Sequence, residues 1–478
     1  MCMYLINYSL NLKSKAYRFS AILVLMLLLN VTIAGEVILK PSVSIKESYT
    51  DNVLLAPKGQ ETGEFVTTVS PAFSLLMKGS HFKANVDYTM QNLFYQKESS
   101  RNNIYHQLSA KSTSELVDDN FFIDFNANRS QQIINADSPV GSNNIAVTGN
   151  KTDVSNYIVE PYLKYSFFNK TDLLLRYTYS AVDYRRDESV DSEQNGEVFK
   201  LNSSSKLTGI SWQLYYSRKE TDYDTGSDSE FKKGSILLGY RFSTRAHVYG
   251  TVGKDENTFF TVTNQSIDDS FWNAGIDMKA GSRDSFTLTY GERFFGHTGS
   301  LHWQHNARRL KLNANYREEL SNSALSLIDL QQSDTLTEQS RQIDTSNSIT
   351  SEVFVKERSS ISAIYTFSKT SIKVSYSNEL RKFQETGDQT RINNASFSVL
   401  LRSSSIMSYI LATRWNRNYT ASSGEKIFTS FIDFSINRRL SPRLTAVVLL
   451  SHGNRHSTIV NSDYDENIVT VGLTQAFN

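Results

Sequence analysis

The chain has 478 residues, with 50 Lys and Arg against 49 Asp and Glu, so its charge excludes a strongly basic nucleic-acid binder and an acidic disordered chain. Apolar residues make up 39% of the sequence, which is too few for a polytopic helical membrane protein. A content of 6 Pro, 25 Tyr and 27 Phe favours β-strands. The remaining classes are a soluble all-β protein and a membrane β-barrel, whose alternating strands keep the mean hydropathy low.

Residues 1–34 have the pattern of a secretory signal peptide. A basic segment at 13–18 precedes the unbroken apolar run Ala21–Leu29. Small residues follow, and we expect cleavage between Ala34 and Gly35. An uncleaved anchor is the alternative, but the apolar run is shorter than the roughly 20 residues that a spanning helix needs.

Cleavage would remove Cys2, which is the only cysteine of the chain. The mature protein would carry 47 Lys and Arg against 49 Asp and Glu. It would have no disulfide, no thiolate metal site and no thiol chemistry. We predict no cofactor.

Period-two alternation runs through the rest of the chain. As an example, Leu173, Leu175 and Tyr177 alternate with Arg176 and Thr178. Successive side chains of a strand point to opposite faces, so each such run has one apolar and one polar face. Runs of about ten residues match the length that a tilted strand needs to cross a bilayer.

The connections between these runs alternate between short and long. Short turns are predicted near residues 79–80, 118–119, 169–171, 204–205, 243–244, 281–282, 307–308, 368–369, 403–404 and 440–442. Longer polar loops are predicted at 51–63, 130–154, 185–197, 221–230, 255–265, 320–350, 384–390, 418–425 and 453–465. This rhythm is typical of outer-membrane barrels, which have short periplasmic turns and long extracellular loops.

We therefore predict an all-β fold, a transmembrane antiparallel up-and-down β-barrel of about 22 strands, within a range of 18 to 24. Residues 35–478 form one domain, and both termini are periplasmic. The first strand begins almost at once after the signal peptide, which leaves no N-terminal region for a separate plug domain. We accordingly do not expect an energised, plugged transporter.

The last residues resemble the closing strand of outer-membrane proteins, which ends in an aromatic residue and is read by the barrel-assembly machinery. Gly472, Leu473 and Phe477 fit that pattern as an assembly signal. Gln475 stands where an apolar residue is usual, and Asn478 follows the terminal aromatic. An ordinary strand end is the alternative interpretation.

The polar faces of the predicted strands lean towards positive charge. The residues that we expect to line the lumen are Lys83, Arg176, Arg241, Lys311, Arg317, Lys373 and Arg414. They are opposed by Asp87, Asp124, Glu160, Asp277, Glu379 and Asp433. One interpretation is a lumen that favours anionic solutes or polymers. The other is an internal network of ion pairs that only stabilises the barrel, and the sequence leaves both open.

Three short motifs carry a resemblance to a known family: Glu47–Val53 (ESYTDNV), Val69–Pro71 (VSP) and Asp87–Thr89 (DYT). With them the chain resembles the outer-membrane β-barrel family associated with the PEP-CTERM/exosortase system. The likeness is best over residues 36–130. It implies the outer membrane of a Gram-negative bacterium and a role near exopolysaccharide or sorted-protein export, and it implies no catalytic residues.

Catalytic and metal sites are not expected. The sequence has no Gly-x-Ser-x-Gly elbow, so a barrel-type hydrolase is the weakest alternative. His302 and His305 lie three residues apart, which puts them on opposite faces of a strand and prevents chelation by the pair. Asp51 and Asn52 fit an Asx turn better than a calcium site, which needs 6–8 oxygens.

The function that these patterns favour is a channel or conduit in an export system, narrowed by loop 320–350 or, second, by loop 130–154. A non-conducting structural or assembly barrel is the alternative. The expected partners are outer-membrane lipid, the barrel-assembly machinery, and periplasmic export components or an anionic polysaccharide. Nucleic acid is not expected.

Overall fold

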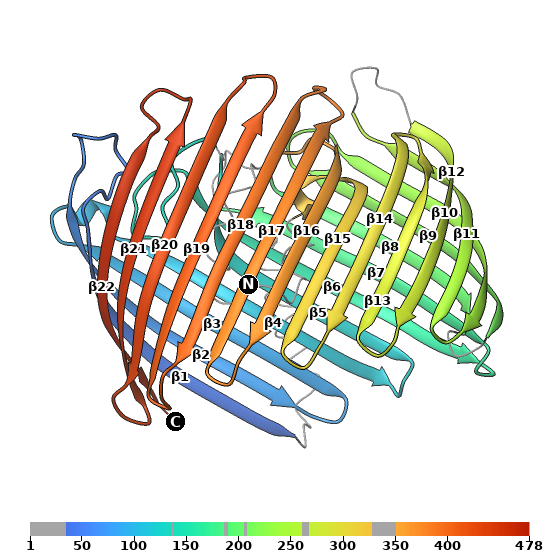
Figure 1. Cartoon of the computed structure of the whole chain (residues 1–478), viewed down its shortest axis with the longest axis horizontal. Coiled ribbons are helices and arrows are strands. Elements are labelled where there is room, and N and C mark those ends of the chain that lie inside the picture. Colours follow the sequence, from blue (N-terminus) through green and yellow to red (C-terminus); the bar gives the residue numbers. More distant parts are fainter. Residues whose placement is uncertain are drawn as a thin grey trace, which may run out of the picture.

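The protein is a closed antiparallel β-barrel of 22 strands (Figure 1). The computed structural model describes residues 35–135, 137–185, 190–204, 208–260, 267–326 and 350–477. Each strand pairs with the next along the chain, and β1 (Glu36–Thr50) pairs with β22 (Tyr464–Ala476) to close the ring. The predicted fold and strand count are confirmed. The predicted signal peptide at 1–34 lies outside the described residues, so cleavage at Ala34 and Gly35 stays a prediction.

The strands between β1 and β22 have similar lengths. They are β2 (Glu64–Lys78), β3 (Phe82–Tyr95), β4 (Asn103–Val117), β5 (Phe121–Ile133), β6 (Lys151–Phe167), β7 (Thr171–Tyr184), β8 (Ser192–Ser203), β9 (Gly209–Tyr223), β10 (Ser229–Ser243), β11 (Ala246–Thr258), β12 (Ile267–Ala280), β13 (Asp284–Arg293), β14 (Gly296–Asn306), β15 (Leu310–Ser321), β16 (Phe354–Thr366), β17 (Thr370–Phe383), β18 (Gln389–Arg402), β19 (Met407–Thr420), β20 (Lys426–Arg439) and β21 (Leu444–Ser457). The single-turn 3₁₀-helix η1 spans Ser99–Arg101.

The two faces of the wall differ in chemistry. Large apolar side chains are exposed on the outer face of most strands, for example Leu238 at 62%, Val252 at 61% and Val471 at 55%. A surface of this kind is stable only against lipid, since water would leave the apolar area unburied. Among the described residues, no helix combines the length and the apolar character that crossing a bilayer requires.

The closing pair of strands explains one residue of the predicted assembly signal. Gly472 lies opposite Lys46, and a Cβ at Gly472 would come within 2.6 Å of the Lys46 Cγ. Beyond the last pair, the Phe477 amide donates to the Pro41 carbonyl at 3.0 Å. Close packing against Lys46 therefore explains why a glycine stands at position 472. Recognition of Gly472, Leu473 and Phe477 by the assembly machinery stays a prediction.

The predicted short turns lie together at one end of the barrel, between the strands that they were predicted to join; of the turn at 204–205, residue 205 lies outside the described residues. In one of them Asp119 has a φ of +59°, a left-handed conformation that Asp tolerates better than most residues. The longer loops lie at the opposite end, as predicted, and we name the two ends periplasmic and extracellular by the predicted topology.

Two extracellular connections were not predicted. One is 96–102, which contains η1. The other is the β13–β14 hairpin, whose turn is only Phe294 and Phe295. The top of β12 at 267–271 extends beyond the short hairpin and has no ladder partner on its side, and the top of β15 at 318–321 has none although β14 continues to Gly296. The extracellular rim therefore has a notch at β13–β14.

The topology predicts a clear labelling pattern. Cysteines introduced at Thr225 and Ser422, in extracellular connections, should react on intact cells with a membrane-impermeant maleimide. Cysteines at Ser80 and Ser404, in periplasmic turns, should react only after the outer membrane is permeabilised. The reverse pattern would invert the topology. The measurement has little background because the only native cysteine, Cys2, lies in the predicted signal peptide.

Candidate functional site in the barrel lumen

The ladder register puts the predicted lumen residues on the face opposite the exposed apolar side chains. Arg176, for example, lies between Leu175 and Tyr177, whose side chains are 39% and 43% exposed on the outer face. Arg414 precedes Trp415, which is 37% exposed on that face. The same alternation holds for Lys83, Arg241, Lys311, Arg317 and Lys373. That these side chains line a conducting path stays a prediction.

The predicted arginines have partners on this face. Arg176 lies 3.9 Å from Glu160, and Arg414 lies 3.3 Å from Asp433. Arg317 lies 2.8 Å from Glu319, which also contacts Lys356 at 3.0 Å. Another, Arg241, donates to the Ser203 hydroxyl at 3.4 Å and to the Ser204 carbonyl at 3.1 Å. For these residues the ion-pair and hydrogen-bond network is the better supported of the two interpretations.

Three predicted lysines differ from the arginines. Lys83, Lys311 and Lys373 form no ion pair with any carboxylate of the described residues, and each follows a periplasmic turn by a few positions. Lys311 and Lys373 both pair with Ile364, so they lie in one row, two strand spacings or about 10 Å apart. The lumen face therefore carries unpaired positive charge near its periplasmic end.

The tip of the β5–β6 hairpin leaves the wall and enters the lumen. The β4–β5 ladder runs from Val117 and Phe121 up to Leu108 and Arg129, where it stops although both strands continue. Above that point, polar side chains of the hairpin contact the inner face of its neighbours. Gln131 lies 3.4 Å from Gln107 of β4, and the Lys151 ammonium lies 6.0 Å from the centre of the Tyr105 ring.

The connection between β5 and β6, residues 134–150, continues along the inner face, and we call it the inner loop. Strands far away in the sequence hold it. The Arg455 guanidinium of β21 donates to the carbonyls of Asp137 at 2.6 Å and Ser138 at 3.1 Å. The Tyr464 hydroxyl of β22 donates to the Val140 carbonyl. Arg455 is 1% exposed, and its loss would remove the donor to the Asp137 carbonyl and leave the Ser138 carbonyl only the Asn150 amide, at 3.4 Å.

The rest of the inner loop is fixed by the β1–β2 connection, β3 and apolar packing. The Tyr95 hydroxyl donates to the Ile145 carbonyl at 2.7 Å, and the Val147 amide donates to the Val53 carbonyl at 2.8 Å. Ile145 packs in a buried cluster with Val53 and Leu93. Complete burial of such side chains contributes roughly 1.5–3 kcal/mol each, so the loop has an apolar core as well as polar anchors.

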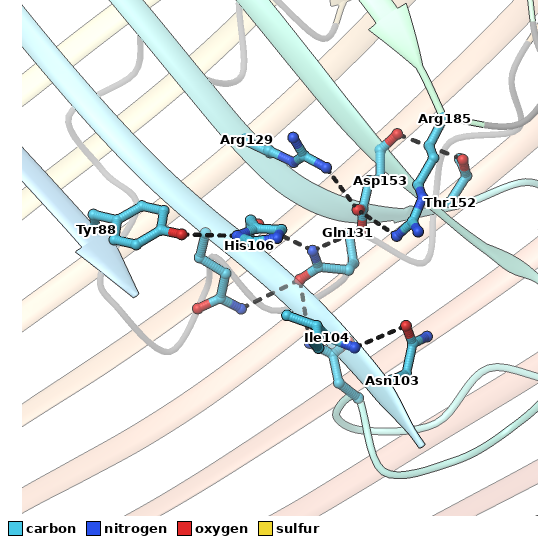
Figure 2. Close-up of polar contacts among 11 residues, drawn as sticks. Tyr88, Asn103, Ile104, His106, Arg129, Gln131, Thr152, Asp153 and Arg185 are labelled. Atoms are coloured by element: carbon cyan, nitrogen blue, oxygen red, sulfur yellow. Dashed lines mark hydrogen bonds and ion pairs between the residues drawn. The ribbon is translucent and has the colours of Figure 1, made fainter. Parts of the chain in front are cut away.

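Where β4 and β5 separate, side-chain amides replace the missing ladder bonds (Figure 2). We call this gap, between 103–107 of β4 and 130–133 of β5, the seam. The Gln131 amide donates to the His106 carbonyl at 3.2 Å and to Asp153 at 3.0 Å. The Ile104 amide donates to the Asn103 side-chain oxygen at 2.9 Å. Asp153 also pairs with Arg129 at 3.0 Å, which ties β5 to β6 at the seam.

The loop ranked first as a constriction, 320–350, is described only at its two ends. Ser323–Ser326 form one helical turn, and Asn322 donates to Ser229 at 3.2 Å. Ala324 packs on the lumen side against Val154 and Val182. The start of this loop therefore folds inward, while 327–349 lie outside the described residues.

The sequence predicts no metal site at a histidine, but the structure brings together one group of possible metal ligands that the sequence did not indicate. His302 and His305 point to opposite faces, as expected, and contact Asn315 and Asp284 respectively. At the periplasmic end, the His81 Nδ1 lies 3.7 Å from Glu115 and 3.5 Å from Asp118. These three could hold a metal ion. His81 lies in the β2–β3 turn, whereas Glu115 and Asp118 lie at the end of β4 and just after it, so no sequence spacing predicts the group. Ion pairing of a protonated His81 accounts for the same geometry.

Together, the closed wall, the apolar outer face and the polar, loop-filled lumen define an outer-membrane β-barrel. Searches of protein-family models and of curated proteins found no match. Among solved structures, the FrpB iron transporter of Neisseria meningitidis is similar in fold. Its F3-3 variant is 11% identical and its F5-1 variant in the apoprotein form is 10% identical, each with a TM-score of 0.50 over 92% of this chain and 81% of that chain. At this identity the likeness concerns the fold alone.

The anchoring of the inner loop can be tested by hydrogen exchange. Arg455→Met removes two charge-assisted hydrogen bonds to the carbonyls of Asp137 and Ser138, at about 1.5–3 kcal/mol each. Amide exchange in 137–147 should then accelerate by tenfold or more, measured by mass spectrometry on the purified barrel. His456→Met is the matched control, because His456 is the next residue along β21 and points to the outer face. Equal exchange rates in both variants would mean that Arg455 does not hold the loop.

Proposed function

We propose that this protein is an outer-membrane conduit whose lumen is narrowed by the inner loop and favours anionic solutes or polymers. The observation that carries the proposal is the inner loop itself, anchored inside a 22-stranded ring. A barrel of this strand number encloses more volume than its own side chains fill. In the described part of the chain, loops and no separate plug domain occupy that volume.

The preference for anions rests on the lysines near the periplasmic end. Low-dielectric walls concentrate the field of Lys311 and Lys373, so counter-ions accumulate beside them. The arginines further up contribute less, since nearby carboxylates neutralise them. In this proposal the lysines make the lumen favour anions, and the arginines belong to the ion-pair network that stabilises the barrel.

The seam supplies a route for opening. If the β4–β5 register continued beyond Leu108 and Arg129, the next pairs would place Ile104 opposite Ile133 on the outer face. Both side chains are apolar, as the lipid-facing side requires. The hairpin tip can therefore return to the wall by exchanging side-chain caps for ladder bonds, which would draw the inner loop out of the lumen.

Association with an exopolysaccharide or protein export system is the finer part of the proposal. It is supported by the resemblance to the PEP-CTERM/exosortase-associated barrels and by the proposed anion-favouring lumen. The partners that it implies are periplasmic export components or an anionic polysaccharide. A non-conducting assembly barrel in the same system is the second candidate, favoured by the ion pairs of the lumen.

Selectivity is tested with the purified barrel in planar bilayers. The native protein should pass current and prefer anions, more strongly at low salt, because the Debye length is about 30 Å at 0.01 M. Lys311→Glu with Lys373→Glu should shift the reversal potential towards cations. Leu312→Val, on the outer face, should leave it unchanged. Absence of current from both the native and the opened barrel described next would favour the assembly-barrel candidate.

Opening is tested with a disulfide. Ile104→Cys with Ile133→Cys should cross-link under oxidant only when the tip lies in the wall, where paired Cα atoms are about 4.5–5.5 Å apart. The oxidised variant should conduct more than the reduced one. Ala110→Cys with Ala127→Cys, a pair within the continuous ladder, is the control and should cross-link without a change in conductance. Failure of the first pair to cross-link would rule out the wall position.

A further inference from the structure

The outer face of the barrel carries three basic residues without a carboxylate partner near the extracellular ends of β18, β19 and β20. Arg391, Arg417 and Lys426 are all exposed and lie on the side of the exposed residues Trp415 and Phe428. None of the three forms an ion pair with a described residue. The three strands lie side by side on the near wall in Figure 1.

The register brings the three charges together. Arg391 lies opposite Tyr419, and Tyr419 lies opposite Lys426, so these residues form one row across the strands. Arg417 lies one step below, diagonal to Arg391 and to Lys426. Diagonal neighbours are about 7–8 Å apart and the row spans about 10 Å, so all three cations lie within reach of one polyanionic group.

Elsewhere on the outer face, basic residues near the rim have partners in the protein. Arg218 contacts Glu230 at 2.6 Å, and Lys232 contacts the same carboxylate at 2.7 Å. Lys254 contacts Glu256 at 2.8 Å. At those places the wall neutralises its own charge. At β18–β20 no carboxylate of the described residues neutralises the three charges, and clustered like charges repel one another, so this place favours an anion supplied from outside the wall.

The surroundings define the anion. Exposed apolar side chains adjoin the three charges: Phe428, at 39%, lies level with Arg417, and Trp415, at 37%, and Ile432, at 43%, lie below, towards the membrane. Basic groups at headgroup height above an apolar, lipid-facing surface match a molecule with phosphates at one end and acyl chains at the other. A soluble anion would use only the upper part of this surface.

We propose that Arg391, Arg417 and Lys426 bind the phosphate groups of a glycolipid in the outer leaflet, with its acyl chains along Trp415, Phe428 and Ile432. The site is separate from the lumen and does not depend on conduction. It holds one lipid against a fixed sector of the wall, on the strands that precede β21, the strand whose inner face carries Arg455.

The test uses the full barrel, purified in detergent and freed of endogenous lipid. Bisphosphorylated lipid A is titrated in, and bound lipid is measured by native mass spectrometry. Each Lys or Arg near a charged lipid surface is worth about fivefold in affinity, so R391Q/R417Q/K426Q should weaken binding on the order of 100-fold. The matched control R218Q/K232Q/K254Q also removes three outer basic residues and should bind within twofold of the native protein.

Further arms separate the sources of phosphate. Lipid A stripped of its phosphates should bind the native barrel as weakly as bisphosphorylated lipid A binds the triple variant. Inorganic phosphate at the lipid concentration should not displace bound lipid A. Equal affinity of native and triple-variant barrels for lipid A, or full displacement by inorganic phosphate, would overturn the proposal. Retention of heat-modifiable migration on gels shows that each variant is folded.

Discussion

The barrel wall depends on one requirement, that every backbone amide and carbonyl in contact with lipid has a hydrogen-bond partner. The chain meets it by pairing each strand with the next and β1 with β22. The alternation of the two faces follows from this ladder, and so does the separation between a lipid-facing surface and a polar interior. Where the ladder stops, at the seam, Asn103 and Gln131 supply the missing partners with side-chain amides.

The inner loop is held mainly through its backbone. Arg455, Tyr464 and Tyr95 all donate to carbonyl oxygens of the loop rather than to its side chains. Such anchors are insensitive to the identity of the loop residues, provided that the chain keeps its path. The position of the inner loop is therefore encoded largely in the strands that receive it.

Much of the fold follows from the sequence because its signal is local. The alternation around Arg176, repeated along the chain, indicates which side chains face outward, and the short turns give the strand count. The β13–β14 hairpin escaped because Phe294 and Phe295 look like strand residues rather than a turn. The anchoring of the inner loop could not be predicted in the same way. Arg455 lies 318 positions from Asp137, and no sequence period connects them.

The lysines of the lumen face show the same limit of prediction from local sequence patterns. Register alone put Lys311 and Arg414 in one class, and only the position of Asp433 on the neighbouring strand β20 separates the unpaired lysine from the paired arginine. Residue type and spacing thus predict which side chains face the lumen. How much of their charge is neutralised depends on contacts between strands.

The seam and the notch at β13–β14 have a mechanical consequence. Both are slots cut into the same rim, and they lie roughly opposite each other in the ring of 22 strands. A cylinder with opposed slots at one end loses hoop stiffness there, so that end deforms into an ellipse under a small load while the uncut end stays round. The slotted end can therefore flatten more easily than the other end, where the ladders continue around the ring.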